Sequence, residues 1–417
     1  MMKLEERGRA KYRPLKNYEP EQVKALLFDK IQEEEEKIKN IDSIEEFPEL
    51  DYQEDKVNVI SLFSGCGGLD LGVELAGLSA AIGEEKALEA FKDKNWYNTV
   101  RESSIFHTIY SNDLFKEANE SYKNNFPDVY QHQLDIKKVK NFPKADLVLG
   151  GFPCPGFSEA GPRLIDDERN FLYIHFIRCL LQSKPFAFIA ENVKGMMTLG
   201  KGEVLNQIVQ DFSSAGYKVK TKLVNARDYG VPQLRERVFI VGIRDDLEFN
   251  YNHPEPTHGE GRSPYVTLKD AIADLEKDPG DWFDGGFSPI YLSRNRKKKW
   301  DEQSFTIQAS GRQAPLHPSG PPMVKLEADK WELSVNPSLH RRLSVKEIAR
   351  IQTFPDWFEF SDGGNMNVQK NNRLDKQYKQ IGNAVPVLLA KAMAMPLANW
   401  AKDNLELIKN SSKEFVK

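Results

Sequence analysis

One cysteine lies in a loop whose composition suits a reactive thiol. Cys154 occupies the middle of residues 150–158, GGFPCPGFS, directly after the apolar run ADLVL at 145–149. The flanking prolines restrict the backbone, so the loop would hold the thiol at the end of a strand. A buried structural cysteine is the alternative interpretation, but the loop is polar and rich in turn residues. The loop therefore predicts a nucleophile for covalent catalysis.

A carboxyl group follows at the end of the next apolar run. Glu191 lies in AENV, which closes the run PFAFIAENV at 185–193. Ends of parallel strands share one edge of a sheet, so Glu191 is expected beside Cys154. A carboxylic acid that protonates N3 of a cytosine makes the ring electrophilic. A thiolate that then adds to C6 makes C5 enamine-like and able to attack a sulfonium methyl group. Taken alone, Glu191 is equally well a surface residue at a strand end.

Two arginines open a further apolar strand. In QLRER at 233–237, strand alternation places Gln233, Arg235 and Arg237 on one face. Two guanidinium groups on one face suit a base carbonyl, a phosphate or the charge of a thiolate. A solvated basic strand is the alternative.

A glycine-rich segment and two acidic residues indicate a cofactor. FSGCGGLD at 63–70 links a predicted buried strand to a helix, where glycines allow a ligand to approach the backbone. Asp113, at the end of IYSND, could bind ribose hydroxyls, and Asp135, in QLDI, could bind an adenine amino group while Ile136 packs on the ring. A plain tight turn and two helix caps are the alternatives. Together the three features predict a nucleoside-bearing cofactor.

The elements that position these residues alternate between strands and helices. Apolar runs at 57–63, 145–152, 185–193 and 238–243 are separated by helical stretches such as 170–182 and 202–212. This order predicts an α/β fold with a Rossmann-like parallel sheet covered by helices on both faces. We expect four parts: a charged, helical and partly disordered extension at 1–56, a catalytic and cofactor-binding domain at 57–244, a smaller irregular domain at 245–335, and a return segment at 336–417 whose last helix packs on the catalytic domain.

Composition excludes several classes of protein. Three cysteines, Cys66, Cys154 and Cys179, fit neither a disulfide scaffold nor a zinc site, and Cys179 lies in an apolar-periodic helix typical of a core. No metal is expected. No apolar run is long enough to span a bilayer, and the charged N-terminus lacks the apolar stretch of a signal peptide. A cytoplasmic location is expected. The net charge of −4 argues only weakly against a nucleic-acid partner, because such a footprint is a local patch.

With these residues assembled, the chain resembles the cytosine-C5 DNA methyltransferase family, in particular bacterial restriction-modification enzymes. The resemblance runs from about residue 57 to 400. Beside the motifs above, it includes RRLSVKEIARIQTFP at 341–355 and QIGNAVP at 380–386. It implies methyl transfer from S-adenosylmethionine to C5 of a cytosine that is flipped out of a short site in double-stranded DNA.

The resemblance also assigns roles to matching positions. Cys154 corresponds to the nucleophile, Glu191 to the partner of N3, and Arg235 and Arg237 to arginines that support the base and the nucleophile. Two departures are Pro155, where the family usually has Gln, and Asp113, where it commonly has Glu. Neither removes a reactive group. The positions that match the cofactor pocket are Phe63, Gly65, Gly67, Leu69, Asp113, Asp135, Ile136, Pro153, Leu172, Asn383 and Val385.

The family keeps its target recognition domain where this chain has residues 245–335. A basic run at 294–300 is expected to touch phosphates, and polar loops to touch base edges, although a solvated loop is the alternative for the run and a structural role the alternative for Arg312. The amino-acid sequence around Cys154 is similar to that of enzymes that modify GGWCC or GGNCC. The residues expected to contact DNA are Ser158, Gln233, Arg296, Lys298 and Arg312.

Two alternative functions share these features. A tRNA cytosine-C5 methyltransferase would have the same scaffold and the same cysteine but a different small domain. A non-catalytic DNA-binding regulator would have lost the cysteine or the glutamate, and both are present here. A methyltransferase of exocyclic amines needs no thiol. On the favoured interpretation, the chain is expected to act as a monomer on double-stranded DNA, with a cognate restriction endonuclease encoded nearby.

Overall fold

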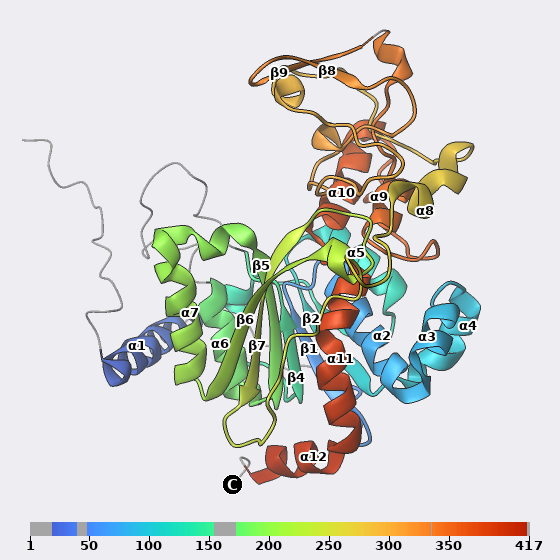
Figure 1. Ribbon diagram of the computed structural model, residues 1–417. Helices are drawn as coiled ribbons and strands as arrows, with labels where there is room; N and C mark the ends of the chain where they lie inside the picture. The colour runs from blue at the N-terminus through green and yellow to red at the C-terminus, as the bar shows by residue number, and fades with distance from the viewer. Residues whose placement is uncertain (1–18, 40–47, 154–171, 335, 415–417) are drawn as a thin grey trace, which may run out of the picture.

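The fold is described by a computed structural model for residues 19–39, 48–153, 172–334 and 336–414. Its centre is a seven-stranded sheet in the order β3-β2-β1-β4-β5-β7-β6 (Figure 1). The strands are β1 (Val57–Leu62), β2 (Phe106–Asn112), β3 (Tyr130–His132), β4 (Leu147–Gly150), β5 (Ala187–Val193), β6 (Tyr217–Asn225) and β7 (Glu236–Arg244).

The first five strands are parallel, as the alternation of strands and helices predicts, but β7 is not. It runs antiparallel to both β5 and β6. A short connection through a turn of 3-10 helix, Ala226–Tyr229, joins β6 to β7, and such a connection can only link antiparallel neighbours. The expectation of an all-parallel sheet is therefore wrong at this edge, and the sheet is mostly parallel.

Helices cover both faces of the sheet, as expected. Helices α2 (Gly68–Ile82) and α11 (Val387–Asp403) pack on one face, where Val57 and Val59 of β1 belong to the same core cluster as Val73 and Leu389. Helices α6 (Leu172–Ser183) and α7 (Glu203–Ser214) pack on the other, in the cluster that contains Ile60 and Leu62. Because residues of β1 point to both helical layers, the strand is buried throughout, including the polar Asn58 and Ser61.

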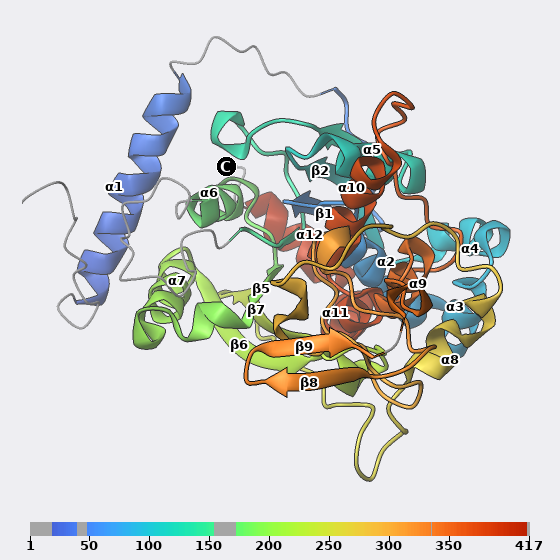
Figure 2. The same ribbon diagram turned by 90° about the horizontal axis from the view of Figure 1, so that it is seen from above.

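The N-terminal part of the chain contains a well-formed helix. Helix α1 (Pro20–Lys39) lies beside α6 and α7 (Figures 1 and 2). It buries Val23, Leu27, Ile31 and Ile38, a spacing that gives one apolar stripe. The helical part of the predicted extension is thus present and packs on the catalytic layer.

The small domain stands above the end of the sheet where the parallel strands finish (Figure 1). It contains α8 (Leu268–Ile272) and the two-stranded ribbon of β8 (Met323–Glu327) and β9 (Lys330–Leu333). The return helices α9 (Val345–Ile351) and α10 (Lys370–Asn383) lie at the same end of the sheet (Figure 1). The remaining helices are α3 (Glu84–Ala90), α4 (Lys94–Val100), α5 (Lys116–Asn125) and α12 (Leu405–Glu414).

The return segment leads from the small domain back to the sheet. Helix α11 runs back along the sheet and packs mainly on α2, as expected of the last long apolar stretch. By length and composition, the stretch Lys370–Asp403 could cross a membrane, a span that the apolar runs of the sequence do not predict. However, 67% of its most apolar window is buried inside the protein, as in an ordinary core helix. The stretch is therefore only weak support for a membrane span.

Candidate active site

A cavity of about 780 Å³ opens at the carboxyl ends of the parallel strands, beneath the small domain. This volume lies within the range of small-molecule sites. Its wall is built from the ends of β1, β2, β4 and β5 and from the segment that joins α10 to α11. Every predicted cofactor residue except Gly67 lines it, and so do Glu191, Arg235 and Arg237. The cavity thus brings together two sets of residues that were predicted separately.

The glycine-rich loop forms one wall of the cavity. Gly65 has a φ of 55° and Gly67 a φ of 92°, in the left-handed region that favours glycine. A Cβ on Gly67 would lie 2.5 Å from the ring of Phe126, so the turn is also too tight for a side chain. Gly67 therefore shapes the loop from behind rather than touching a ligand.

Asp113 holds the loop against the end of β2. Its carboxylate accepts hydrogen bonds from the backbone N–H groups of Gly65 (2.9 Å) and Phe115 (2.7 Å). Burial raises the pKa of Asp113, and these backbone donors oppose the rise. The residue lies in the cavity wall as the ribose assignment requires, and it also fixes the loop that faces the same ligand.

The adenine end of the predicted cofactor site lies at the start of a short 3-10 helix. Asp135 caps this helix, Ile136–Lys138, by accepting from the N–H of Lys137 at 3.0 Å. Ile136 is buried behind it, and Leu172, the first residue of α6, lines the same cavity. A carboxylate beside two apolar side chains suits a flat ring that carries an amino group.

We expect Asp135→Ala to weaken the binding of S-adenosylmethionine by about 1–3 kcal/mol, the scale for a hydrogen-bonding group left without its partner. Titration calorimetry measures this directly. Asp128→Ala, in the exposed turn before β3, is the matched control and should bind normally. Unchanged affinity in the Asp135 variant would place the adenine ring elsewhere.

The other end of the cavity holds a buried ion pair. Glu191 is 8% exposed, and its Oε1 lies 2.8 Å from Nε of Arg237. The antiparallel pairing of β5 with β7 sets Val193 opposite Arg237, which brings the two strands' functional side chains together. Arg237 thus orients the carboxyl group that the sequence predicts as the partner of N3.

The backbone leading to the predicted nucleophile borders this ion pair. Asn192 donates to the carbonyl of Phe152 at 2.9 Å, and Pro153 lines the cavity. Cys154 follows Pro153 directly, but Cys154 and Ser158 lie outside the described residues. The other two thiols, Cys66 and Cys179, are buried, and burial raises the pKa of each to about 12. Cys179 is a core cysteine, and Cys66 lines the cavity but has a thiol whose raised pKa keeps it protonated, so Cys154 stays the predicted nucleophile.

Arg235 and Gln233 are both buried, and Arg235 lines the cavity. The guanidinium of Arg235 is buried and donates to the carbonyls of Ile307, Gly382 and Ala384 at 2.9–3.1 Å. It therefore ties β7 to the small domain and to the cofactor wall. Gln233 is fully buried between Gln352 and the N–H of Ile307, so a direct contact of this side chain with DNA is excluded in this arrangement.

The basic run at 294–300 is only partly folded inward: Arg296 and Lys297 are buried, whereas Arg294 and Lys299 are exposed. Arg296 is 5% exposed and donates to the carbonyl of Tyr291 and the side chain of Gln313. Lys298 is half-buried, and its ammonium group lies 2.8 Å from Glu302. Arg296 is thus held inside the small domain, whereas the phosphate contact of Lys298 stays a prediction. Arg312 is exposed, as a contact with DNA requires.

Some residues of the cavity were not foreseen. Leu114, which follows Asp113, is 65% exposed although it is large and apolar, and it lines the cavity with Phe115. The ammonium group of Lys379 lies 4.2 Å from the centre of the Phe115 ring. In the sequence, the apolar pair Leu114–Phe115 directly after the acidic Asp113 was the signal that could have predicted these cavity residues.

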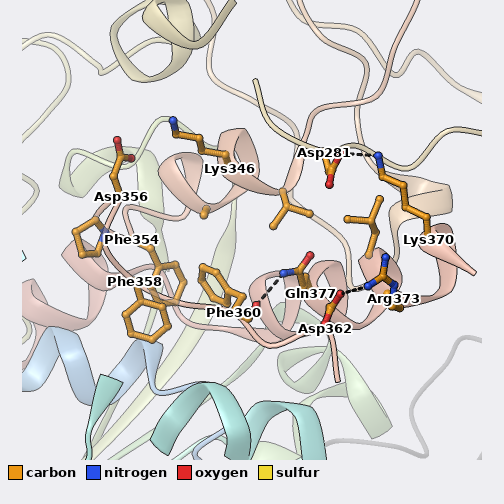
Figure 3. A pocket seen from close by; sticks show the side chains of 14 residues that line it. Asp281, Lys346, Phe354, Asp356, Phe358, Phe360, Asp362, Lys370, Arg373 and Gln377 are labelled. Atoms are coloured by element: carbon orange, nitrogen blue, oxygen red, sulfur yellow. Dashed lines mark hydrogen bonds and ion pairs between the residues drawn. The ribbon is translucent and has the colours of Figure 1, made fainter. Parts of the chain in front are cut away.

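A second, smaller cavity of about 360 Å³ lies between α9, α10 and the segment that joins them (Figure 3). Four of its charged residues form two pairs, Lys370 with Asp281 and Arg373 with Asp362, and Phe354, Phe358 and Phe360 supply an aromatic part of its wall. Within the described part of the chain, no group of three or more His, Cys, Asp or Glu is placed to hold a metal ion.

Comparisons with known proteins identify the family. A family profile described as C-5 cytosine-specific DNA methylase matches residues 57–399. The chain is 66% identical to the Type II methyltransferase M.BsuRI of Bacillus subtilis, over 98% of this chain and 95% of that protein. It is 63% identical to the Type II methyltransferase M.BspRI of Lysinibacillus sphaericus, over 97% and 96%. A crystal structure described as a putative DNA modification methyltransferase encoded within an E. coli prophage matches with a TM-score of 0.58 and 24% identity, over 83% of this chain and all of that one, which supports the fold.

Proposed function

Since the chain belongs to the C-5 cytosine-specific DNA methylase family, we propose that it moves a methyl group from S-adenosylmethionine to C5 of a cytosine rotated out of a short duplex site. The observation that supports this proposal is that one cavity contains both groups of residues. The predicted cofactor residues line one end of it, and the Glu191–Arg237 pair lies at the other end. Such an arrangement allows a methyl donor and a base to meet.

Each of these residues has its own role in the proposed methyl transfer. S-adenosylmethionine, when bound, supplies the activated methyl group, held by Asp135 and Ile136 at its adenine and by Asp113 at its ribose. The Cys154 thiolate adds to C6 of the cytosine while Glu191, in its acid form and oriented by Arg237, gives its proton to N3. C5 then attacks the methyl group, whose bond to the sulfonium sulfur breaks, so that S-adenosylhomocysteine leaves. Loss of the C5 proton to water in the site, release of the thiolate from C6 and return of the N3 proton to Glu191 restore the aromatic ring and the enzyme.

The relatives suggest the biological setting. Both similar proteins are Type II methyltransferases. We propose that this chain acts in the cytoplasm as a monomer and protects host DNA against a cognate restriction endonuclease. A tRNA substrate is disfavoured, because the matching family profile describes a DNA methylase.

The experiment that tests the substrate is bisulfite sequencing of DNA from a host that expresses this chain. Converted reads should show 5-methylcytosine at one short sequence throughout the genome. GGWCC and GGNCC are the candidates from the resemblance, and the reads reveal directly whether a central base pair separates the two half-sites. Absence of any methylated site, together with methylation of purified tRNA by the pure protein, would overturn the proposal.

Recognition is expected to involve Arg312 in the short 3-10 helix Gly311–Gln313 of the small domain. Arg312→Ala should cost about 1–3 kcal/mol at the cognate site, mostly as lost discrimination between sequences, the scale for one base contact. Competition binding with cognate and altered duplexes measures it. Lys402→Ala, in the last turn of α11, is the control and should not change discrimination. Equal loss on all duplexes would assign Arg312 to the phosphates or to the folding of the domain.

A further inference from the structure

Helix α1 precedes the part of the chain that matches the family, yet it packs against elements that form the predicted cofactor pocket. The family match begins at residue 57, whereas α1 spans Pro20–Lys39. Figure 2 shows α1 beside α6 and α7, and it also contacts the 3-10 helix Ile136–Lys138 that Asp135 caps, called here the Asp135 helix. Residues of α6 and of the Asp135 helix line the cavity, whereas none of the described residues of α1 does. Helix α1 therefore touches the adenine side of the pocket from outside.

The first contact between α1 and these elements is apolar. Leu27 is 4% exposed and Ile31 is 5% exposed, and both belong to the core cluster that contains Ile136 and Val139, at the start and just after the end of the Asp135 helix. Ile136 also lines the cavity, and so does Leu172, which packs against the same cluster. Because protein interiors are close-packed, a displacement of α1 would loosen these wall residues.

The second contact is polar and involves Arg178 of α6. This side chain is 1% exposed, its guanidinium group donates to the carbonyl of Val139, and it lies 5.0 Å from the centre of the Phe142 ring. Burial lowers the pKa of Arg178 to about 10, while the carboxylates of Glu35 and Glu34 oppose that shift. Both carboxylates belong to α1. Since buried charges need such partners, α1 balances the cation that holds the end of the Asp135 helix.

A third contact involves the segment that follows the Asp135 helix. The N–H of Phe142 donates to Oε1 of Gln182 at 2.9 Å, and the amide nitrogen of Gln182 lies 3.5 Å from the carboxylate of Glu35. Two side chains of α6, Arg178 and Gln182, thus bind the backbone at 139–142 and also interact with acidic residues of α1. The position of this backbone therefore depends on where α1 packs.

We propose that α1 positions the adenine side of the cofactor pocket. It holds the Asp135 helix and α6 together from outside the cavity, and Arg178 fixes the end of that helix through the carbonyl of Val139. Helix α1 and Arg178 do not touch the cofactor; they are positioning elements that act through Asp135 and Ile136. The inference rests on the proposed function, since it requires S-adenosylmethionine with its adenine at Asp135.

Leu27→Asp and Leu26→Asp form a matched pair within one helix. Both introduce the same residue at the same cost in helix propensity, but Leu27 is buried, whereas Leu26 is 52% exposed. Leu27→Asp should weaken the binding of S-adenosylmethionine about tenfold in titration calorimetry and raise its KM about equally, because a carboxylate in the apolar contact displaces α1. The kcat at saturating cofactor should stay within twofold of wild type, since Glu191 and Arg237 lie on other elements.

Hydrogen exchange reports on the positioned segment itself. The backbone amides of residues 136–142 should exchange faster in Leu27→Asp than in Leu26→Asp. Three results would overturn the proposal: unchanged affinity and exchange in Leu27→Asp, an equal loss of affinity in Leu26→Asp, or a fall in kcat as large as the loss of affinity.

A milder variant tests the polar contact without disturbing the apolar one. Glu35→Gln removes a charge that faces Arg178 and should weaken the binding of S-adenosylmethionine about threefold. Glu36→Gln, at an exposed position of the same helix, is its control and should bind as wild type. If Leu27→Asp does not fold, this pair decides, and equal affinities in the two glutamine variants would overturn the proposal.

A double-mutant cycle shows whether α1 acts through Asp135. In the Asp135→Ala background the contact that α1 positions is already absent, so Leu27→Asp should weaken binding by about threefold there rather than tenfold. A general loosening of the protein would give the same tenfold loss in both backgrounds, and that result would contradict the inference.

Failure of this inference differs from failure of the proposed function. If the wild-type protein binds no S-adenosylmethionine and methylates no duplex, the proposed function fails and this inference fails with it. If the wild type does both and the α1 variants match it, only this inference fails.

Discussion

Replacing Cys154 by alanine is expected to abolish methyl transfer while leaving the binding of S-adenosylmethionine and of DNA largely intact. Without the thiolate, nothing adds to C6, and C5 of an unactivated cytosine is too weak a nucleophile to take a methyl group. The cofactor contacts come from other strand ends, those of β1 and β2 and the segment around Asp135. Transfer of labelled methyl groups to a duplex, beside calorimetry for the cofactor, measures both properties.

Cys179→Ala is the control for the loss of a thiol. Cys179 is buried in α6, away from the cavity wall, and should be dispensable for methyl transfer. Near-normal methylation by Cys154→Ala, or a comparable loss in the Cys179 variant, would contradict covalent catalysis at Cys154.

Glu191→Gln is expected to slow methylation by ~10² or more, the usual scale for the loss of a positioned general acid. Glutamine keeps the shape of the side chain but cannot deliver a proton to N3, and the ion pair with Arg237 is lost with the charge. Single-turnover methylation of a cognate duplex measures the effect, and the affinity for S-adenosylmethionine should barely change.

The matched control lies on the facing strand. Glu236 is an exposed glutamate of β7 that pairs with Lys194, and Glu236→Gln should methylate at the wild-type rate. A Glu191→Gln variant within a few-fold of wild type would assign the protonation of N3 to another group.

The main layer of the fold and the assembly of the cavity could be predicted because their determinants are local. Continuous apolar runs identify buried parallel strands, and residues at strand ends meet at one edge of the sheet. For this reason the sequence alone predicts that Gly65, Asp113, Asp135 and Glu191 share one site, and all four line the cavity.

The direction of β7 and the presence of β6 could not be predicted in the same way. β6 carries lysines at alternate positions, Lys218, Lys220 and Lys222, and has no continuous apolar run. Without β6, the pattern of alternating strands and helices implies a parallel β7. β7 pairs with β6 in the antiparallel direction, and no continuous apolar run in the sequence identifies β6 as a strand.

The partners of buried polar residues could not be predicted either. Arg235, Gln233 and Arg296 have the residue types of solvent-facing or ligand-facing groups. In the structure they satisfy backbone carbonyls and amides elsewhere in the chain, such as the carbonyl of Gly382 for Arg235. Buried polar groups must find such partners, but the sequence does not show which segments supply them.

Covalent trapping on a duplex that carries 5-fluorocytosine at the target position tests the central claim most directly. Fluorine at C5 blocks the final elimination, so an enzyme that attacks C6 stays attached to its DNA. In the presence of S-adenosylmethionine, the wild-type protein should give a complex that survives denaturing electrophoresis, and the attached peptide should contain Cys154. Cys154→Ala should give none. Failure of the active wild-type protein to form the adduct, or an adduct that persists in Cys154→Ala, would contradict the account.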